Sequence, residues 1–342
     1  MLNTQMDIYR LIIIIVASIF AGLNIIVYFS LFLPFIRRKK MNVPTTNKML
    51  PFLYREWGDL IFQEIDFLKK YGCERIEQRS FDKHKLAADL YTVPDAKGTV
   101  ILCHGFQGYA YADNGVATAH FIKEGYNALI IYQRAHFESE GKNICFGIKE
   151  RYDCLGWIKI INSRFGEELP VFLYGISMGA ATVLMTTGFN LPQNVKCVIA
   201  DCGFTSPYEI FKSVLKHIFP FLQIGWMMVF IFAGYNIKQY STLKAMKKNR
   251  IPVIFFHGQK DAFVPSFMSR QNYDACIAPK ELYLVPDARH TQSLYTHQNY
   301  YWDKIREFMK KSVDGTFEKE EYQNYEKIEI VIENKDSENK AV

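Results

Sequence analysis

The sequence predicts an α/β domain built on a mostly parallel sheet of about eight strands with helices on both faces. Short apolar runs alternate with helical patterns through the middle of the 342-residue chain, and the runs lack polar alternation. Continuous Val, Ile, Leu and Phe are typical of strands that are buried on both faces of a parallel sheet. These runs are residues 99–103, 128–132, 171–174, 195–200, 253–256 and 282–285.

Two segments with better polar alternation precede these runs. Residues 74–80 and 85–91 predict an antiparallel pair at the start of the sheet. Residues 54–71 have the spacing of an amphipathic helix. We therefore expect a linker and helix over residues 41–73, followed by one domain over residues 74–311.

The amino-terminal residues 11–36 contain no acidic or basic side chain. As a helix this stretch would be roughly 39 Å long, which exceeds the ~30 Å of bilayer hydrocarbon. We expect an uncleaved transmembrane anchor within residues 1–40. The alternative is a cleaved signal peptide, which would need basic residues before a shorter apolar run. Because Arg37, Arg38, Lys39 and Lys40 follow the run, the expected topology is a single pass at the cell membrane, with the amino terminus outside and the main domain cytoplasmic.

The net charge of +6 is unevenly distributed. Residues 312–342 are rich in acids, and we expect them to form a solvated, mostly disordered tail. The alternation of Ile328, Ile330 and Ile332 is that of an edge strand, but we do not predict a strand there. An excess of +6 is too weak to indicate nucleic acid. The seven cysteines match neither a zinc-ligand pattern nor a disulfide scaffold, so we expect no metal and no organic cofactor.

A candidate nucleophile lies in the pattern G-x-S-x-G at residues 175–179, between a predicted strand and a helical segment. At a strand-to-helix turn this pattern holds its serine in a strained conformation above the sheet. The dipole of the following helix favours negative charge there. The context predicts Ser177 as the nucleophile.

A serine nucleophile needs a base that accepts its proton and an acid that orients the base. Asp261 follows the strand 253–256, and His290 follows the next strand. Because the carboxyl ends of parallel strands meet at one edge, we expect a Ser177–His290–Asp261 triad there. His297 is an alternative base. Asp201 is an alternative acid, although hydrogen bonding to the following turn is the simpler role for it.

Acyl transfer also needs two N–H donors where the carbonyl oxygen becomes negative. The sequence HGFQG at residues 104–108 ends a predicted strand, and we expect the amides of Phe106 and Met178 to form this oxyanion hole. His104 is expected to brace the loop, because its strand precedes the nucleophile.

Together these motifs resemble the α/β-hydrolase superfamily across residues 74–311. The chain is most similar to membrane-anchored bacterial serine hydrolases of the serine-aminopeptidase and prolyl-oligopeptidase-like branch, through residues 133–136, 139–141, 146–153 and 201–206 as well. The resemblance implies the same roles for the triad and the oxyanion donors. Relatives often have Asp where Tyr132 stands and Gly where Phe137 stands, so we expect a differently shaped loop beside the pocket.

Residues 206–246 lie where this fold commonly carries a helical cap, and residues 218–235 are dense in apolar side chains. This segment could be a cap helix packed on the core, an acyl-chain pocket, or a patch that dips into the bilayer. It contains no acidic cluster for a peptide amino terminus. The residues expected to contact the substrate are Gly105, Gln107, Trp226 and Phe230.

The sequence therefore predicts a membrane-anchored serine hydrolase that cleaves a carboxylic ester or thioester with an apolar acyl group, through an acyl-enzyme. The alternatives are an aminopeptidase-like amidase or peptidase, and a binding protein that has the fold without the activity.

Overall fold

The computed structural model describes residues 2–32, 43–214, 216, 230, 234–317 and 328–330. These residues form a nine-stranded sheet in the order β1-β2-β4-β3-β5-β6-β7-β8-β9. The strands are β1 (Glu74–Arg79), β2 (Lys85–Tyr91), β3 (Thr99–Cys103), β4 (Asn127–Ile131), β5 (Val171–Ile176), β6 (Val195–Asp201), β7 (Val253–Gly258), β8 (Lys280–Val285) and β9 (Ile328–Ile330). β2 pairs antiparallel with both β1 and β4, and every other neighbouring pair is parallel. The mostly parallel sheet is confirmed, and β9 extends it beyond β8.

The predicted apolar runs form the centre of the sheet. Every residue of β3, β4, β5 and β7 is buried. Such strands can be buried throughout only because helices cover both of their faces. This burial explains why their sequences lack polar alternation.

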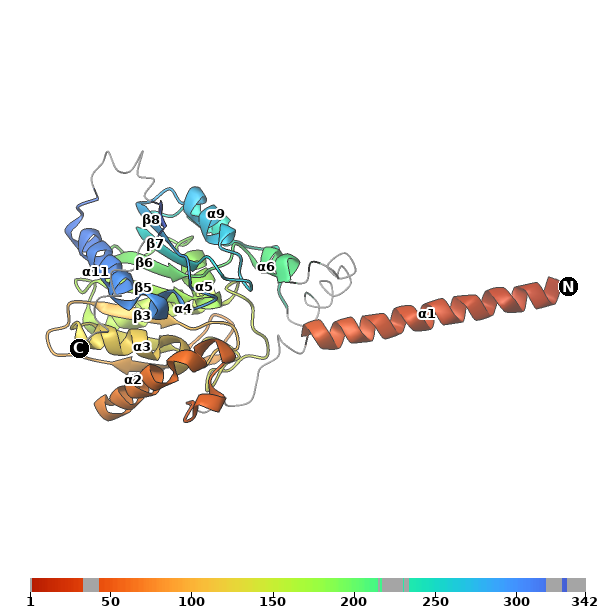
Figure 1. Ribbon diagram of the computed structural model, residues 1–342, viewed down its shortest axis with the longest axis horizontal. Helices are drawn as coiled ribbons and strands as arrows, with labels where there is room; N and C mark the ends of the chain where they lie inside the picture. Colours follow the sequence, from red (N-terminus) through yellow and green to blue (C-terminus); the bar gives the residue numbers. More distant parts are fainter. Residues whose placement is uncertain are drawn as a thin grey trace, which may run out of the picture.

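Helices cover both faces of the sheet (Figure 1). One face packs against α2 (Gly58–Tyr71), α3 (Ala110–Lys123), α10 (Ser293–Thr296) and α11 (Gln298–Asp314). The other face packs against α4 (Glu150–Phe165), α5 (Met178–Thr186), α8 (Thr242–Met246) and α9 (Phe267–Ala275). The two core clusters lie on opposite sides of the strands and leave the carboxyl ends of the parallel strands for loops.

The helix expected over residues 54–71 begins later than predicted. Phe52–Trp57 forms a 3₁₀ helix, η3, after Pro51, and α2 begins only at Gly58. At the junction Trp57 has φ −105° and ψ 21°, which are not α-helical values. The amphipathic pattern is continuous here, but the backbone changes direction within it.

The amino-terminal helix α1 spans Leu2–Phe32. Its side chains at residues 6–22 include several large apolar groups that are at least half exposed, among them Leu11, Ile13, Ile14, Val16 and Ile19. In the part of the chain that the structure describes, no helix has the length and apolarity needed to cross a membrane. The predicted span over residues 11–36 continues past these side chains, and its last residues lie outside the described ranges.

The predicted cap and tail lie largely outside the described residues. The cap region begins with α6 (Pro207–Val214) and ends with α8. Residues 217–229 and 231–233, which include Trp226, are not described. In the predicted tail, α11 continues to Asp314 and β9 is placed, whereas residues 318–327 and 331–342 lie outside the described ranges.

Candidate active site

Ser177 lies in the sharp turn between β5 and α5. Its backbone has φ 55° and ψ −116°, a conformation that L residues rarely adopt. The flanking glycines make the turn possible. A Cβ atom at Gly175 would lie 2.3 Å from the carbonyl oxygen of Gly179, and one at Gly179 would lie 2.0 Å from that of Cys103. The strained serine thus stands at the carboxyl end of its strand and at the start of a helix.

Three residues separated widely in the sequence form one chain of hydrogen bonds. The Oγ of Ser177 lies 2.9 Å from Nε2 of His290. The Nδ1 of the same imidazole lies 2.7 Å from Oδ2 of Asp261. All three side chains are largely buried, with 5–7% of their surface exposed. The structure therefore brings together the serine, histidine and aspartate that the sequence singled out.

The Asp261 carboxylate is surrounded by hydrogen-bond donors. Its Oδ1 accepts from the amides of Phe263 and Val264 at 2.9 and 2.8 Å, and its Oδ2 lies 3.2 Å from Nε2 of His257. Burial would raise the pKa of Asp261, but the hydrogen bonds from His257 and His290 outweigh it and hold the pKa well below its usual range. Asp261 is thus an anion fixed against the imidazole.

The alternative acid and base occupy other positions. Asp201 is fully buried, accepts a hydrogen bond from the Ser293 hydroxyl at 2.9 Å, and has its pKa raised to about 6 by burial. Its carbonyl oxygen accepts the Ser177 amide at 2.8 Å, so its backbone supports the turn of Ser177 rather than the turn that follows Asp201. His297 lies between α10 and α11, and the ring next to the serine hydroxyl is that of His290.

The loop after β3 lies against the nucleophile. A Cβ atom at Gly105 would be 3.5 Å from Cβ of Ser177, so the next residue, Phe106, is close to the serine. His104 is fully buried, with Nδ1 2.8 Å from the Gly105 carbonyl oxygen and Nε2 3.2 Å from the Gln133 amide. Burial keeps the pKa of His104 well below its usual value. This geometry matches the bracing role expected of His104.

The loop after β3 is also held at Gln107, and the amide of Met178 is the second expected donor. The Gln107 amide lies 3.2 Å from Nε2 of His136, and its own φ is 51°. Met178 is the first residue of α5, where backbone N–H groups have no partner within the helix. Both expected oxyanion donors therefore belong to the two backbone segments that flank Ser177.

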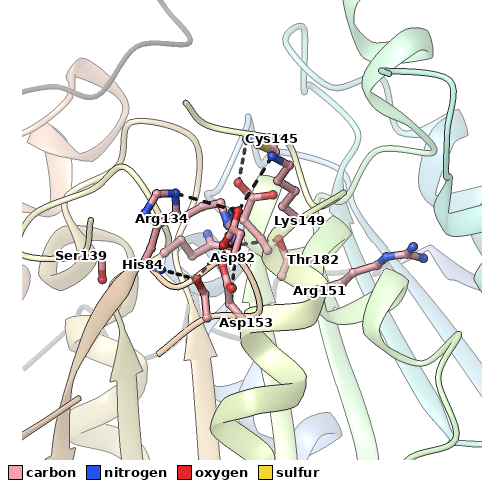
Figure 2. Close-up of polar contacts among 12 residues, drawn as sticks. Asp82, His84, Arg134, Ser139, Cys145, Lys149, Arg151, Asp153 and Thr182 are labelled. Atoms are coloured by element: carbon pink, nitrogen blue, oxygen red, sulfur yellow. Dashed lines mark hydrogen bonds and ion pairs between the residues drawn. The ribbon is translucent and has the colours of Figure 1, made fainter. Parts of the chain in front are cut away.

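A buried ion cluster holds the loop after β4 (Figure 2). Arg134 is 2% exposed, and two of its nitrogens lie 2.7 Å from the two carboxylate oxygens of Asp153 in α4. It also reaches Asp82 at 2.8 and 3.2 Å. Burial raises the pKa of Asp153 to about 7 against the opposing effect of Arg134. Such a paired guanidinium fixes the loop firmly, because removing one partner would leave a buried charge.

That loop carries an aromatic side chain to the site. The ring of Phe146 stacks on the ring of Phe106 at 4.8 Å between centroids and contacts Phe211 of α6 at 4.9 Å. These rings belong to an apolar cluster that also contains Met178, Phe204, Val264 and Met268. No sequence pattern predicts this cluster, because its members come from five separate segments with no shared motif. It gives the neighbourhood of Ser177 an apolar wall.

The remaining predicted contact residues are not all placed at the site. Trp226 lies outside the described residues, and Phe230 is 59% exposed. The two departures from the resembled family are in contact with each other. The rings of Tyr132 and Phe137 lie 5.0 Å apart, and Phe137 adopts φ 49°, the left-handed region that favours glycine.

Among the described side chains, the combination that could hold a metal ion is Cys202, Asp261 and His290, whose ligand atoms lie within 4.8 Å of one another. The carboxylate already accepts four hydrogen bonds, and the imidazole is bonded to Ser177 and Asp261. Burial also raises the pKa of the Cys202 thiol, which opposes the thiolate form that binds metals. This arrangement fits a proton-transfer chain better than a metal site.

Comparisons with known proteins agree with this geometry. A family model described as serine aminopeptidase, S33, matches residues 94–224. The uncharacterized protein YqkD of Bacillus subtilis is 27% identical over 65% of this chain and 74% of its own length. Protein bem46 of Schizosaccharomyces pombe is 23% identical over 71% of this chain and 83% of its own.

Two solved structures share the fold. The esterase Pf2001 of Pyrococcus furiosus has a TM-score of 0.61 at 20% identity, covering 81% of this chain and 99% of that one. The acylaminoacyl peptidase of Pyrococcus horikoshii has a TM-score of 0.54 at 17% identity, covering 78% of this chain and 46% of that one. The chain therefore has the α/β-hydrolase fold, and its serine turn and these relatives support a hydrolase of that superfamily.

Proposed function

We propose that the protein is a serine hydrolase that cleaves a carboxylic ester or thioester with an apolar acyl group. The observation that carries this proposal is the continuous hydrogen-bonded chain from the Ser177 hydroxyl through His290 to Asp261. A hydroxyl bonded to a neutral imidazole whose other nitrogen faces a fixed carboxylate is the arrangement that activates serine as a nucleophile.

The proposed reaction has two steps. The Ser177 oxygen attacks the acyl carbon while Nε2 of His290 takes the hydroxyl proton, and the alkoxide or thiolate leaves with that proton. Water then attacks the acyl-enzyme with His290 as the base, which releases the acid and restores the serine. The amides of Phe106 and Met178 bind the oxyanion in both steps, and one such donor is typically worth about 10²–10³ in rate.

The apolar wall supports an apolar acyl group. The cluster of Phe106, Phe146 and Met178 borders the nucleophile. On the other side, the Phe263 ring lies 5.2 Å from the His290 imidazole and is 47% exposed. An acyl chain placed between these groups would bury apolar surface that water now contacts, at about 25 cal/mol per Å².

The second candidate is an amidase or peptidase. The serine aminopeptidase description of the matching family model and the acylaminoacyl peptidase among the structural neighbours favour it. The two candidates differ in the leaving group, so one pair of substrates separates them.

The test compares p-nitrophenyl esters from two to sixteen carbons with aminoacyl p-nitroanilides. We expect ester hydrolysis with kcat/KM that rises beyond acetate, and little anilide cleavage. Ser177→Ala should lower kcat by about 10⁴–10⁶, because the nucleophile is lost. Ser163→Ala, at an exposed serine on α4, is the matched control and should be unchanged. Preference for anilides would support the peptidase, and full esterase activity of Ser177→Ala would refute the proposal.

We also propose that residues 11–36 anchor the enzyme in the cell membrane, with its amino terminus outside and the hydrolase domain in the cytoplasm. The length and apolarity of this segment and the basic residues 37–40 support the proposal. An apolar acyl substrate and a membrane-held enzyme are chemically consistent, since such substrates partition into lipid.

A further inference from the structure

The turn that carries the Phe106 amide closes around a buried carboxylate. Asp113, in the first turn of α3, is 4% exposed, and its Oδ2 accepts the Gly105 amide at 2.7 Å. A Cβ atom at Gly108 would lie 2.0 Å from the same oxygen, so the loop wraps tightly over it. The Gly108 amide completes the turn by bonding to the Gly105 carbonyl oxygen at 3.3 Å. The shape of this turn therefore depends on Asp113.

A residue from before the sheet reaches the same carboxylate. Tyr54, in η3, is 3% exposed; burial and the nearby Asp113 carboxylate raise the pKa of its hydroxyl, whereas Thr291 lowers it. Thr291 directly follows His290. One hydroxyl thus lies between the loop of the expected oxyanion donor and the loop of the expected base.

Neighbouring residues of the same segment hold the histidine loop. The Leu53 carbonyl oxygen accepts the Gln292 side-chain amide at 2.9 Å. The ring of Trp57 stacks on that of Tyr295 at 5.2 Å, and the Tyr54 ring meets Tyr295 edge-on at 5.8 Å. Residues 53–57 therefore contact both sides of the site, although they precede the first strand of the sheet.

We propose that Asp113, oriented by Tyr54, is a positioning residue for the oxyanion hole, so that the segment preceding the sheet is a working part of the active site. This inference rests on the proposed function, because it takes the Phe106 amide as an oxyanion donor. By binding the Gly105 amide from inside the turn, the carboxylate fixes the backbone that leads into Phe106. A misplacement of about 1 Å in such a site can cost about 10² in rate.

The positioning role needs Asp113 in its ionised form. In that form both carboxylate oxygens can accept hydrogen bonds, whereas the protonated form carries a proton on one of them. Burial raises the pKa of Asp113 to about 6, while hydrogen bonds from Gly105 and Tyr54 act in the opposite direction. The titratable groups that face it from other elements are Tyr54 of η3 and Tyr295 of α10, and the carboxylate contributes to raising the pKa of both. At acidic pH, protonation of Asp113 should therefore disable the turn.

The experiment measures kcat, KM and the pH dependence of kcat/KM for the full chain in detergent with p-nitrophenyl butyrate. The variants are Asp113→Asn and Tyr54→Phe, and the control is Tyr91→Phe. Tyr91 is a buried tyrosine whose hydroxyl bonds to Tyr111 at 2.8 Å, so the control also loses one buried hydrogen bond. Tyr91 lies in β2, away from the serine turn.

We expect both site variants to lower kcat by about tenfold or more with KM changed less than threefold, because the oxyanion is bound more weakly than the substrate. On the acid side, log kcat/KM should fall more steeply in the wild type than in Asp113→Asn, because the variant has no carboxylate to protonate at this position. Tyr54→Phe should keep the steeper slope and move the acid limb to higher pH, because Tyr54 holds the pKa of Asp113 down. The control should match the wild type.

The inference is overturned if both variants keep wild-type kcat and pH slope, or if Tyr91→Phe loses as much kcat as Tyr54→Phe. If Asp113→Asn does not fold, the pH profile of Tyr54→Phe still tests the inference. A shift of its acid limb to higher pH supports the positioning role, and an unshifted limb rejects it. Ser177→Ala separates this inference from the proposed function. An inactive Ser177→Ala beside unaffected Asp113 and Tyr54 variants rejects the positioning role alone, whereas an active Ser177→Ala rejects the serine mechanism itself.

Discussion

Two buried aspartates at the site have opposite pKa shifts, and the difference follows from their donors. Asp261 accepts four hydrogen bonds, two of them from imidazoles, and its pKa is depressed. Asp113 is equally buried but has fewer donors, and its pKa is raised to about 6. Desolvation acts on both carboxylates, so the number of donors decides the sign.

This difference predicts opposite pH dependences of stability. Ionised Asp261 contributes stability that is present above its unfolded pKa near 4 and is lost as pH falls through its depressed folded pKa. The contribution of Asp113 is present below that unfolded pKa and is lost as pH rises through about 6, which amounts to about 3 kcal/mol at pH 7. We therefore expect Asp113→Asn to gain stability relative to the wild type between pH 4.5 and 7.5, whereas the difference between Asp261→Asn and the wild type stays constant there and shrinks only below about pH 4. Urea unfolding of each variant at the two pH values measures this, and parallel curves would contradict it.

The hydrogen-bonded chain of Ser177, His290 and Asp261 was predictable from the sequence because each residue follows an apolar strand in a fixed order. Asp113 and Tyr54 were not, because their contact joins residues far apart in the chain and neither lies in a motif. His257 lies four residues before Asp261, yet its contact with the carboxylate depends on a turn that only the structure defines.

At the level of secondary-structure elements, a buried ion cluster positions one of the loops that surround the site. Arg134 ties the loop after β4 to α4 through Asp153, and this loop brings Phe146 against Phe106. The strands themselves were predicted almost to the residue, since burial on both faces leaves a clear apolar signal. The start of α2 was not, because the same amphipathic pattern continues through the 3₁₀ turn that precedes it.

Removing the guanidinium should therefore be costly at this position. Arg134→Met leaves the Asp153 carboxylate buried without its partner, and we expect a loss of about 3–5 kcal/mol. Arg164→Met is the matched control, since Arg164 of α4 pairs with Glu74 at the surface and such exposed pairs are worth less than about 1 kcal/mol. Chemical denaturation of both variants measures the difference. Equal losses would show that the cluster around Arg134 has no special role.

In the whole molecule, an amino-terminal apolar helix precedes the proposed hydrolase domain. Residues 53–57, which lie between the two in the sequence, contact the active site. The exposed apolar side chains of α1 support the proposed anchor. Composition and the charge pattern lead to that proposal, whereas the contacts of residues 53–57 with the site depend on tertiary packing that no local pattern records.

The topology makes a direct prediction. The protein should remain in the membrane pellet after an alkaline carbonate wash, because an apolar segment of this length is not held by surface charge. A reporter fused after Lys40 or at the carboxyl terminus should be active only in its cytoplasmic form. An external reporter at either position would contradict the proposed orientation, and release by carbonate would contradict the anchor.

The most direct test of the central claim is fluorophosphonate labelling followed by peptide mass mapping. We expect one adduct, on the peptide that contains Ser177, with labelling much slower in His290→Gln and absent in Ser177→Ala. An adduct on another residue, or equal labelling of the wild type and Ser177→Ala, would contradict the assignment of Ser177 as the nucleophile.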